Sequence, residues 1–262
     1  MNLQLLSDLH LETEDFSPRP APQADLLVLA GDVDSTWEGL GLFADWPVPV
    51  VYVPGNHEFD GRDVDEALAG LRDHCRQLGI TLLERDTSIV TAPDGRRVRL
   101  LGTTRWCDFD LFGEDQRARS MRAAAYFVKV MKATRHGQPF APDVVRDEAL
   151  LCKQWLADTL AQQPTPERHW DSTVVITHYG PSILSADPRY GRQPGTASFC
   201  NADDDLLPLA QLWVHGHLHC RHDYMVAHDR GRTRVVSNAR GHGYKRESDG
   251  YDGLRCVPVP FA

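Results

Sequence analysis

Residues 50–58 read VVYVPGNHE, in which four apolar residues are followed directly by Pro54-Gly55 and then by Asn56, His57 and Glu58. A short apolar run that ends at proline or glycine is typical of a buried β-strand. Gly55 permits a tight turn at this point, because glycine tolerates backbone conformations that other residues avoid. The stretch therefore predicts a strand whose carboxyl end carries an amide, an imidazole and a carboxylate.

Four other apolar runs in the chain have the same design. Leu3–Leu6 is followed by Asp8 and His10, Leu26–Ala30 by Gly31-Asp32, Val174–Ile176 by His178, and Leu212–Val214 by His215, Gly216, His217 and His219. In open α/β sheets, ligands bind in the crevice beyond the carboxyl ends of the strands. The repeated pattern therefore predicts that these polar side chains converge on one site.

The spacing of apolar residues predicts alternating strands and helices, as in an α/β protein. The predicted strands are Leu3–Ser7, Leu26–Ala30, Val48–Val53, Ile80–Leu83, Ile89–Ala92, Val98–Gly102, Thr173–Thr177, Leu212–His215, Tyr224–Val226, Thr233–Ser237 and Leu254–Pro258. Helices are expected over 63–79, from Glu114 to about Ala133, and from near Asp143 onward. The length of 262 residues favours a single domain over residues 1–262, with a helical insertion at about 110–165. That insertion either packs outside a sheet or forms a partial lid over a site.

The composition argues against several classes of protein. A net charge of −9 disfavours long nucleic acid or an anionic membrane as a partner, since both select a basic surface. A small anionic substrate stays compatible with this charge, because bound divalent cations can reverse the local field. No apolar run approaches the roughly 20 residues of a membrane span, and the N-terminus lacks the features of a signal peptide. The six scattered cysteines form no CxxC pair, so free thiols and a cytoplasmic location are expected.

The residue types at the strand ends suit divalent metal ions. The candidate donors are Asp8, His10, Asp32, Asn56, His178, His217 and His219. Imidazole together with carboxylate favours Mn, Fe, Zn, Co or Ni, whereas an all-oxygen cage would favour Mg or Ca. The number of these donors exceeds the number of ligands that one tetrahedral metal site uses. Two ions about 3.5–4 Å apart that share one carboxylate would use all of them.

In their order along the chain, these motifs resemble those of the calcineurin-like metallophosphoesterase family. The matching segments are Asp8-Leu9-His10, Gly31-Asp32, Gly55-Asn56-His57-Glu58, His178 and Gly216-His217-Leu218-His219. The resemblance implies a four-layer α/β/β/α sandwich of two mixed sheets with flanking helices. It implies one metal ion held by Asp8, His10 and His219. It also implies a second ion held by Asn56, His178 and His217, with Asp32 bridging the two. His57 matches the family's non-ligand histidine, which approaches the leaving-group oxygen.

These residues predict a phosphoester hydrolase that uses two divalent cations, with Mn²⁺ expected first and Fe, Zn, Ni or Co as alternatives. A hydroxide that bridges two cations is a nucleophile at neutral pH, since metal ions lower the pKa of water towards about 7. Asp32 and His57 are the predicted catalytic residues, and His57 would donate a proton to the departing alkoxide. The expected substrate is a phosphomonoester or phosphodiester of a small molecule or nucleotide.

Two other functions remain open at this point. A protein Ser/Thr phosphatase would use the same metal chemistry, and it would present a large open surface groove instead of a helical lid. A non-catalytic interaction scaffold of the same fold would typically have damaged motifs, whereas no motif member is missing from this chain.

Residues beside the motifs provide candidate substrate contacts. Arg105 and Arg240 follow predicted strands, and arginine can bind phosphate through two parallel hydrogen bonds. Tyr179 directly follows His178 and is expected to line the pocket. For His215, Asp34 and Glu58, an orienting role beside a ligand and a purely structural or solvated role both stay open. The isolated histidines are expected to be structural, and these are His74, His136, His169, His222, His228 and His242.

Overall fold

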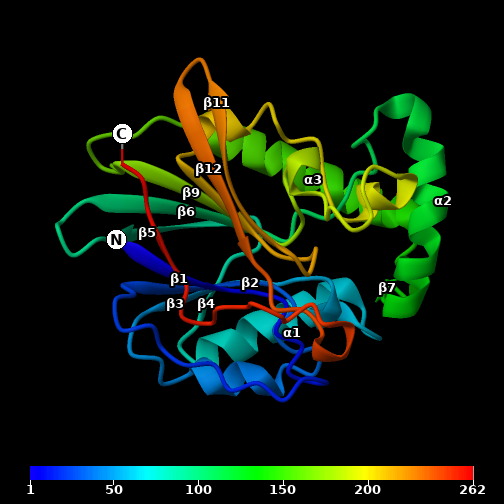
Figure 1. The fold of residues 1–262 in the computed structure, drawn as a ribbon, viewed down its shortest axis with the longest axis horizontal. Helices are drawn as coiled ribbons and strands as arrows, with labels where there is room; N and C mark the ends of the chain where they lie inside the picture. The colour runs from blue at the N-terminus through cyan, green and yellow to red at the C-terminus, as the bar shows by residue number, and fades with distance from the viewer. Residues whose placement is uncertain (262) are drawn as a thin grey trace.

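The computed structural model describes residues 1–261, the side chain of residue 127 excepted, and it consists of two β-sheets packed face to face with helices outside them (Figure 1). The first sheet has the strand order β13 (Cys256–Pro258), β1 (Asn2–Leu6), β2 (Leu26–Ala30), β3 (Val50–Val53) and β4 (Thr81–Leu82). Strands β1 to β4 are parallel, and β13 pairs antiparallel with β1. The carboxyl ends of β1, β2 and β3 therefore lie at one edge of this sheet.

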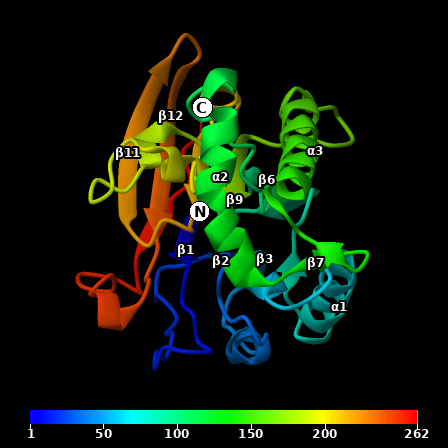
Figure 2. The same cartoon turned by 90° about the vertical axis from the view of Figure 1, so that its right-hand side faces the viewer.

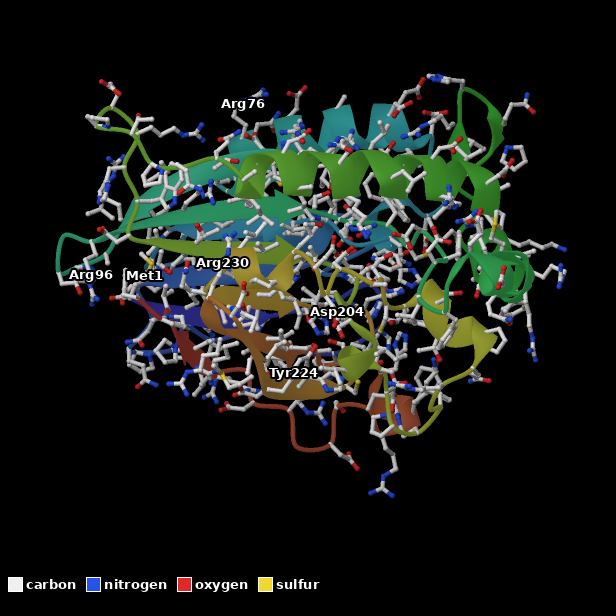
Figure 3. All side chains as sticks on the ribbon, turned by 90° about the horizontal axis from the view of Figure 1, so that it is seen from above. Met1, Arg76, Arg96, Asp204, Tyr224 and Arg230 are labelled. Atoms are coloured by element: carbon white, nitrogen blue, oxygen red, sulfur yellow. The ribbon has the colours of Figure 1, made fainter. Side chains whose placement is uncertain are left out.

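The second sheet is also mixed. Its strand order is β11 (Arg221–His228), β12 (Gly231–Asn238), β10 (Leu212–His215), β9 (Ser172–Thr177), β6 (Arg97–Thr103) and β5 (Asp86–Thr91). The four inner strands are parallel, and the two edge strands pair antiparallel with their neighbours. Strands β5 and β6 form a hairpin. Arg96 lies in the turn of this hairpin, at the end of the molecule opposite helix α2 (Glu114–Met131) (Figures 1 and 3).

The main core lies between the two sheets. Because successive side chains of a strand face opposite sides, Leu3 and Leu5 of β1 pack against Val174 and Val214 of the second sheet. Leu6 instead packs in the layer outside the first sheet. This arrangement of buried faces explains why the apolar runs of the sequence marked the strands so clearly. Mixed sheets with flanking helices confirm the predicted fold class.

Each sheet is covered on its outer face by one long helix. Helix α1 (Val64–Gln77) begins at Asp63, whose carboxylate accepts a hydrogen bond from the backbone N–H of Asp65. Leu71 and Cys75 of α1 pack against the first sheet. Helix α3 (Pro142–Leu160) packs Leu156 and Leu160 against the second sheet. These contacts complete the four layers.

Helix α2 (Glu114–Met131) takes no part in these layers. It stands at one end of the sandwich, as Figure 2 shows from that side. A short hairpin of β7 (Thr134–Arg135) and β8 (Gln138–Pro139) connects it to α3. The segment expected as a helical insertion thus contains two helices with different roles, since α3 covers a sheet whereas α2 lies at the carboxyl-end side of the strands.

Residues 1–261 also contain six short 3₁₀ helices, and the sequence analysis predicted none of them. They are η1 (Glu38–Phe43), η2 (His57–Phe59), η3 (Ile183–Ser185), η4 (Pro194–Ser198), η5 (Leu207–Leu209) and η6 (Gly243–Lys245). All six cysteines carry free thiols, as expected. Within residues 1–261, no helix is both long and apolar enough to cross a bilayer. The cytoplasmic location stays a prediction.

Candidate metal centre

The loops that follow five parallel strands meet at one edge of the sandwich and bring the predicted donors together. Donor atoms of Asp8, His10, Asp32 and His219 lie within 4.8 Å of one another. Those of Asp32, His178 and His217 form a second group within the same limit. The amide oxygen Oδ1 of Asn56 lies 3.2 Å from Nε2 of His178 and so belongs beside the second group. Asp32 is common to both groups.

The chemistry of these donors fits divalent cations. Nε2 of His10 and Nε2 of His219 face each other at 3.0 Å. Oδ2 of Asp32 is buried without a hydrogen-bond partner, 3.2 Å from Nε2 of His178. A buried carboxylate oxygen without a hydrogen-bond donor is costly, and a bound cation would satisfy both this oxygen and the imidazole lone pairs.

Each histidine of the cluster is oriented by a second group on its other ring nitrogen. Nδ1 of His219 lies 2.7 Å from Oε2 of Glu247, and Nδ1 of His10 lies 3.3 Å from Oε1 of Glu12. Nδ1 of His178 lies 2.8 Å from the carbonyl oxygen of Ala30. A proton on Nδ1 leaves the Nε2 lone pair free for a metal ion. His217 has the reverse arrangement, because its Nε2 lies 3.2 Å from the carbonyl of Ser198 and its Nδ1 is left for an ion.

The sequence analysis did not select Glu12 or Glu247. Glu12 could have been found from its spacing, since it lies two residues beyond His10 on the same loop. Glu247 carried no local signal, because it reaches His219 from a loop 28 residues further along the chain.

Glu58 is a buried brace for the donor loops and not a solvated charge. Its carboxylate accepts hydrogen bonds from the backbone N–H groups of Asp32, Val33 and Gly55 at 2.7–3.1 Å. Burial, followed by the nearby charge of Asp32, raises its pKa to about 7. Gly55 must stay small, because a Cβ atom there would overlap Oδ1 of Asp32. Glu58 thereby fixes the loops after β2 and β3 relative to each other.

His57 lies at the edge of the donor cluster with its side chain 32% exposed. Its backbone N–H donates to Oδ1 of Asp32 at 2.9 Å, and its Nδ1 lies 2.7 Å from Oδ2 of Asp60. Burial alone would lower the pKa of His57, but Asp32 and Asp60 outweigh it and raise the pKa to about 10. For Asp32, an acid, burial alone would raise the pKa. The neighbouring His178 and His57 outweigh burial and hold the pKa of Asp32 well below its usual range. The negative charge of Asp32 thus favours the protonated form of His57 and raises the pKa of that imidazole.

A cavity of 580 Å³ opens over the donor cluster. Asp32, Asn56 and His57 line its floor. Part of its wall is apolar and comes from α2, through Ala124, Val128 and Met131. Further lining residues include Trp106, Tyr179, Phe199 and the η4 residues Thr196 and Ser198.

Tyr179 is the one predicted substrate contact that the structure brings to this cavity. Its ring is buried, with its centroid 4.1 Å from that of His217. Arg105 is fully buried instead, and its guanidinium donates to Asp203 and Asp108 at 2.7–2.9 Å. Because two carboxylates already hold it inside the protein, Arg105 is not available to bind a phosphate in the cavity.

Arg240 does not line the cavity either. Its Nη1 donates to Oε2 of Glu14 at 2.9 Å, and its guanidinium lies 4.9 Å from the ring centroid of Phe16. The cations Arg189 and Lys245, which the sequence analysis did not select, line the cavity instead. Arg189 is paired with Asp187 at 2.6 Å.

Two histidines outside the motifs have different surroundings. His215 is a buried core residue, whose Nε2 lies 2.9 Å from Oγ of Ser185. His242 was expected to be structural like the other isolated histidines. It lines the cavity, and one of its ring nitrogens lies within 4.8 Å of the donor atoms of His10 and His219.

The chain resembles known proteins both in sequence and in fold. The model of the calcineurin-like phosphoesterase family matches residues 3–221. A solved structure of a phosphopantetheinyl hydrolase from Mycobacterium tuberculosis is similar, with a TM-score of 0.73 and 19% sequence identity over 98% of this chain and 95% of that one. No curated protein matches the chain by sequence. At this identity the structural likeness concerns the fold.

Proposed function

The chain belongs to the calcineurin-like phosphoesterase family, and from this premise we propose that it hydrolyses phosphoesters with two divalent cations. As a member of the family it is a metal-dependent phosphoesterase. We assign one ion to Asp8, His10 and His219, and the other to Asn56, His178 and His217. Asp32 is the shared ligand.

One observation carries the proposal for two ions. The donor atoms fall into two groups, each within 4.8 Å, and Asp32 is the residue common to them. A single tetrahedral ion would leave part of this buried donor set without a partner. Two ions that share a carboxylate would use the whole set.

When bound, the two cations would lower the pKa of a water molecule towards about 7 and neutralise charge on the phosphoryl oxygens. The chain's own residues then have separable roles. Asp32 holds negative charge at the centre, and Glu58 fixes its loop through three backbone hydrogen bonds. His57 donates a proton to the departing oxygen, and Asp60 orients its ring from the Nδ1 side at 2.7 Å.

The cavity favours a small organic phosphoester over a phosphoprotein. Helices α2 and η4 contact each other, and both contribute to the cavity wall. A protein Ser/Thr phosphatase would need an open groove for a polypeptide. The apolar wall supports a phosphomonoester or phosphodiester with a partly apolar organic group, and we include nucleotides among the candidates. The phosphopantetheinyl group named for the similar structure joins the same screen.

The test begins with metal-free protein loaded with one divalent metal at a time. Mn²⁺ comes first because of the mixed imidazole and carboxylate donors, and Fe²⁺, Zn²⁺, Co²⁺ and Ni²⁺ follow. Phosphomonoesters, phosphodiesters, pyrophosphates, a phosphoserine peptide and a phosphopantetheinyl ester are the substrates. We expect two bound ions per chain and turnover of at least one small ester.

Asp32→Ala should abolish this turnover, because the variant loses the shared ligand. Asp73→Ala is the matched control, since Asp73 is an exposed carboxylate on α1. Wild-type protein without turnover under any of these metals would contradict the proposal and favour the interaction scaffold. Preferential hydrolysis of the phosphoserine peptide would favour the protein phosphatase.

A further inference from the structure

We propose that His242 is an additional ligand of the cation that we assign to Asp8, His10 and His219. His242 lies outside the motifs, in the loop between β12 and η6. The inference rests on the proposed function in one respect, namely that an ion is bound at this position.

The first argument is position. The ring of His242 stacks on that of His10, with centroids 4.4 Å apart and an interplanar angle of 28°. Its centroid lies 5.1 Å from that of His219, with the two rings edge to face. Each of the three residues offers a ring nitrogen, and these nitrogens lie within 4.8 Å of one another. Three imidazole nitrogens this close together form a donor set that a transition metal ion prefers.

The second argument is orientation. Nδ1 of His242 is buried and lies 3.5 Å from Oε1 of Glu14, without forming a hydrogen bond. His10 has Glu12 on its Nδ1, and His219 has Glu247 on its Nδ1. His242 thus repeats, at a longer distance, the arrangement in which a carboxylate faces Nδ1 and leaves Nε2 for an ion.

The third argument is the anchoring of the loop. Backbone N–H groups of Arg240 and Gly241 donate to the carbonyl oxygens of Ser7 and Asp8, each at 3.0 Å. The N–H of His242 donates to Oε2 of Glu247 at 3.0 Å, the same oxygen that lies against Nδ1 of His219. His242 is therefore held in register with two of the other donors to this ion.

The test measures metal binding directly. Calorimetric titration of metal-free protein with Mn²⁺ gives the affinities of both ions, and the visible spectrum of the Co²⁺-loaded protein reports the coordination of the metal. His242→Ala removes the donor. His242→Phe keeps an aromatic ring next to His10 but has no nitrogen, so it separates coordination from packing. Asp249→Ala is the control, because Asp249 follows η6, its exposed carboxylate pairs with Arg246, and it does not line the cavity.

Both His242 variants should bind one of the two ions about 10–100-fold more weakly, as losses of metal-site partners do. Their Co²⁺ spectra should change in the same way, while Asp249→Ala should match the wild type. Unchanged metal affinities and an unchanged Co²⁺ spectrum in His242→Phe would overturn the inference. If KM rose in such a variant, His242 would be a substrate contact instead of a metal ligand. A wild-type protein that binds no second ion would contradict the proposed function itself, which is a different outcome.

Discussion

The donor residues themselves hold unusual backbone conformations. Five of the residues that carry donor atoms have φ between 49° and 71°, in the left-handed region, and these are Asp8, His10, Asp32, His217 and His219. This region costs a residue other than glycine roughly 1–2 kcal/mol. The fold maintains the strain through hydrogen bonds between loops, such as those from the N–H of Asp8 to Gly31 and of His10 to Asp32. Strain that the surrounding structure imposes is typical of functional sites, so these loops are arranged by the fold before an ion binds.

Replacing His57 tests the residue that turns metal binding into catalysis. In His57→Ala we expect turnover of an alkyl phosphoester to fall about 10²–10⁴-fold, because the leaving oxygen loses its proton donor. Hydrolysis of a p-nitrophenyl ester should fall much less, since that leaving group departs without a proton. The bound metal should be unchanged by elemental analysis. The role would be refuted by unaltered turnover of the alkyl ester.

Comparing the turnover of the alkyl and p-nitrophenyl esters in Asp60→Asn tests whether Asp60 positions the proton donor His57. Asp60 contacts Nδ1 of His57 and orients its ring, so we expect a smaller loss with the same dependence on the leaving group. A loss that is equal for both esters would place Asp60 in a purely structural role.

At the scale of residues, the sequence predicted which side chains lie together at the strand ends, but it did not predict most of the groups that orient them. The seven donors follow strands directly, so the strand pattern alone places them at one edge of the sandwich. Arg105 also follows a strand, but that position does not determine burial, and its pairing with Asp203, 98 residues further along the chain, could not be anticipated. His242 lies more than 200 residues from His10 in the sequence, and no local pattern links them.

Among the elements, the strands and long helices could be predicted, whereas the cavity wall could not. Every predicted strand is present to within a few residues, because buried faces demand continuous apolar runs. The sequence of α2 has the pattern of a helix, but this pattern does not predict which other element the helix contacts. The segment that contains η4 has no apolar periodicity. The contact between α2 and η4, which helps form the wall, depends on tertiary structure alone.

Filling the wall from α2 should narrow the choice of substrates without changing the metal centre. Ala124 is buried and lines the cavity. We expect Ala124→Leu to reduce kcat/KM for an ester with a bulky organic group about tenfold or more, because the added carbon atoms occupy the space for that group. Activity on methyl phosphate esters should change little. Steady-state kinetics on the two esters gives the ratio.

The matched control for this prediction is Ala125→Leu. Ala125 is the next residue of α2 and is exposed, and it does not line this cavity. Equal losses on both esters in Ala124→Leu would mean that α2 supports the fold and does not select the substrate.

For the molecule as a whole, the metal centre joins the two sheets. Asp8, Asp32 and Asn56 follow strands of the first sheet, whereas His178 and His217 follow strands of the second. Protein contacts already connect the two sides. The N–H of His217 donates to Oδ1 of Asp8 at 2.9 Å, and Nδ1 of His178 lies 2.8 Å from the carbonyl oxygen of Ala30. Ions bound here would add a connection that the unfolded chain lacks, so metal binding and global stability should be linked.

This linkage predicts that metal raises the melting temperature. An ion at a concentration 100 times its Kd stabilises the folded state by about 2.7 kcal/mol. In a protein of this size about 1 kcal/mol shifts Tm by roughly 2–4 °C, so Mn²⁺ should raise Tm of the metal-free protein by several degrees. Asp32→Ala should lose most of this rise, because both ions share Asp32, whereas His57→Ala should keep it. Differential scanning calorimetry with and without Mn²⁺ decides the matter: an undiminished rise in Asp32→Ala would mean that the ions stabilise the protein from somewhere else.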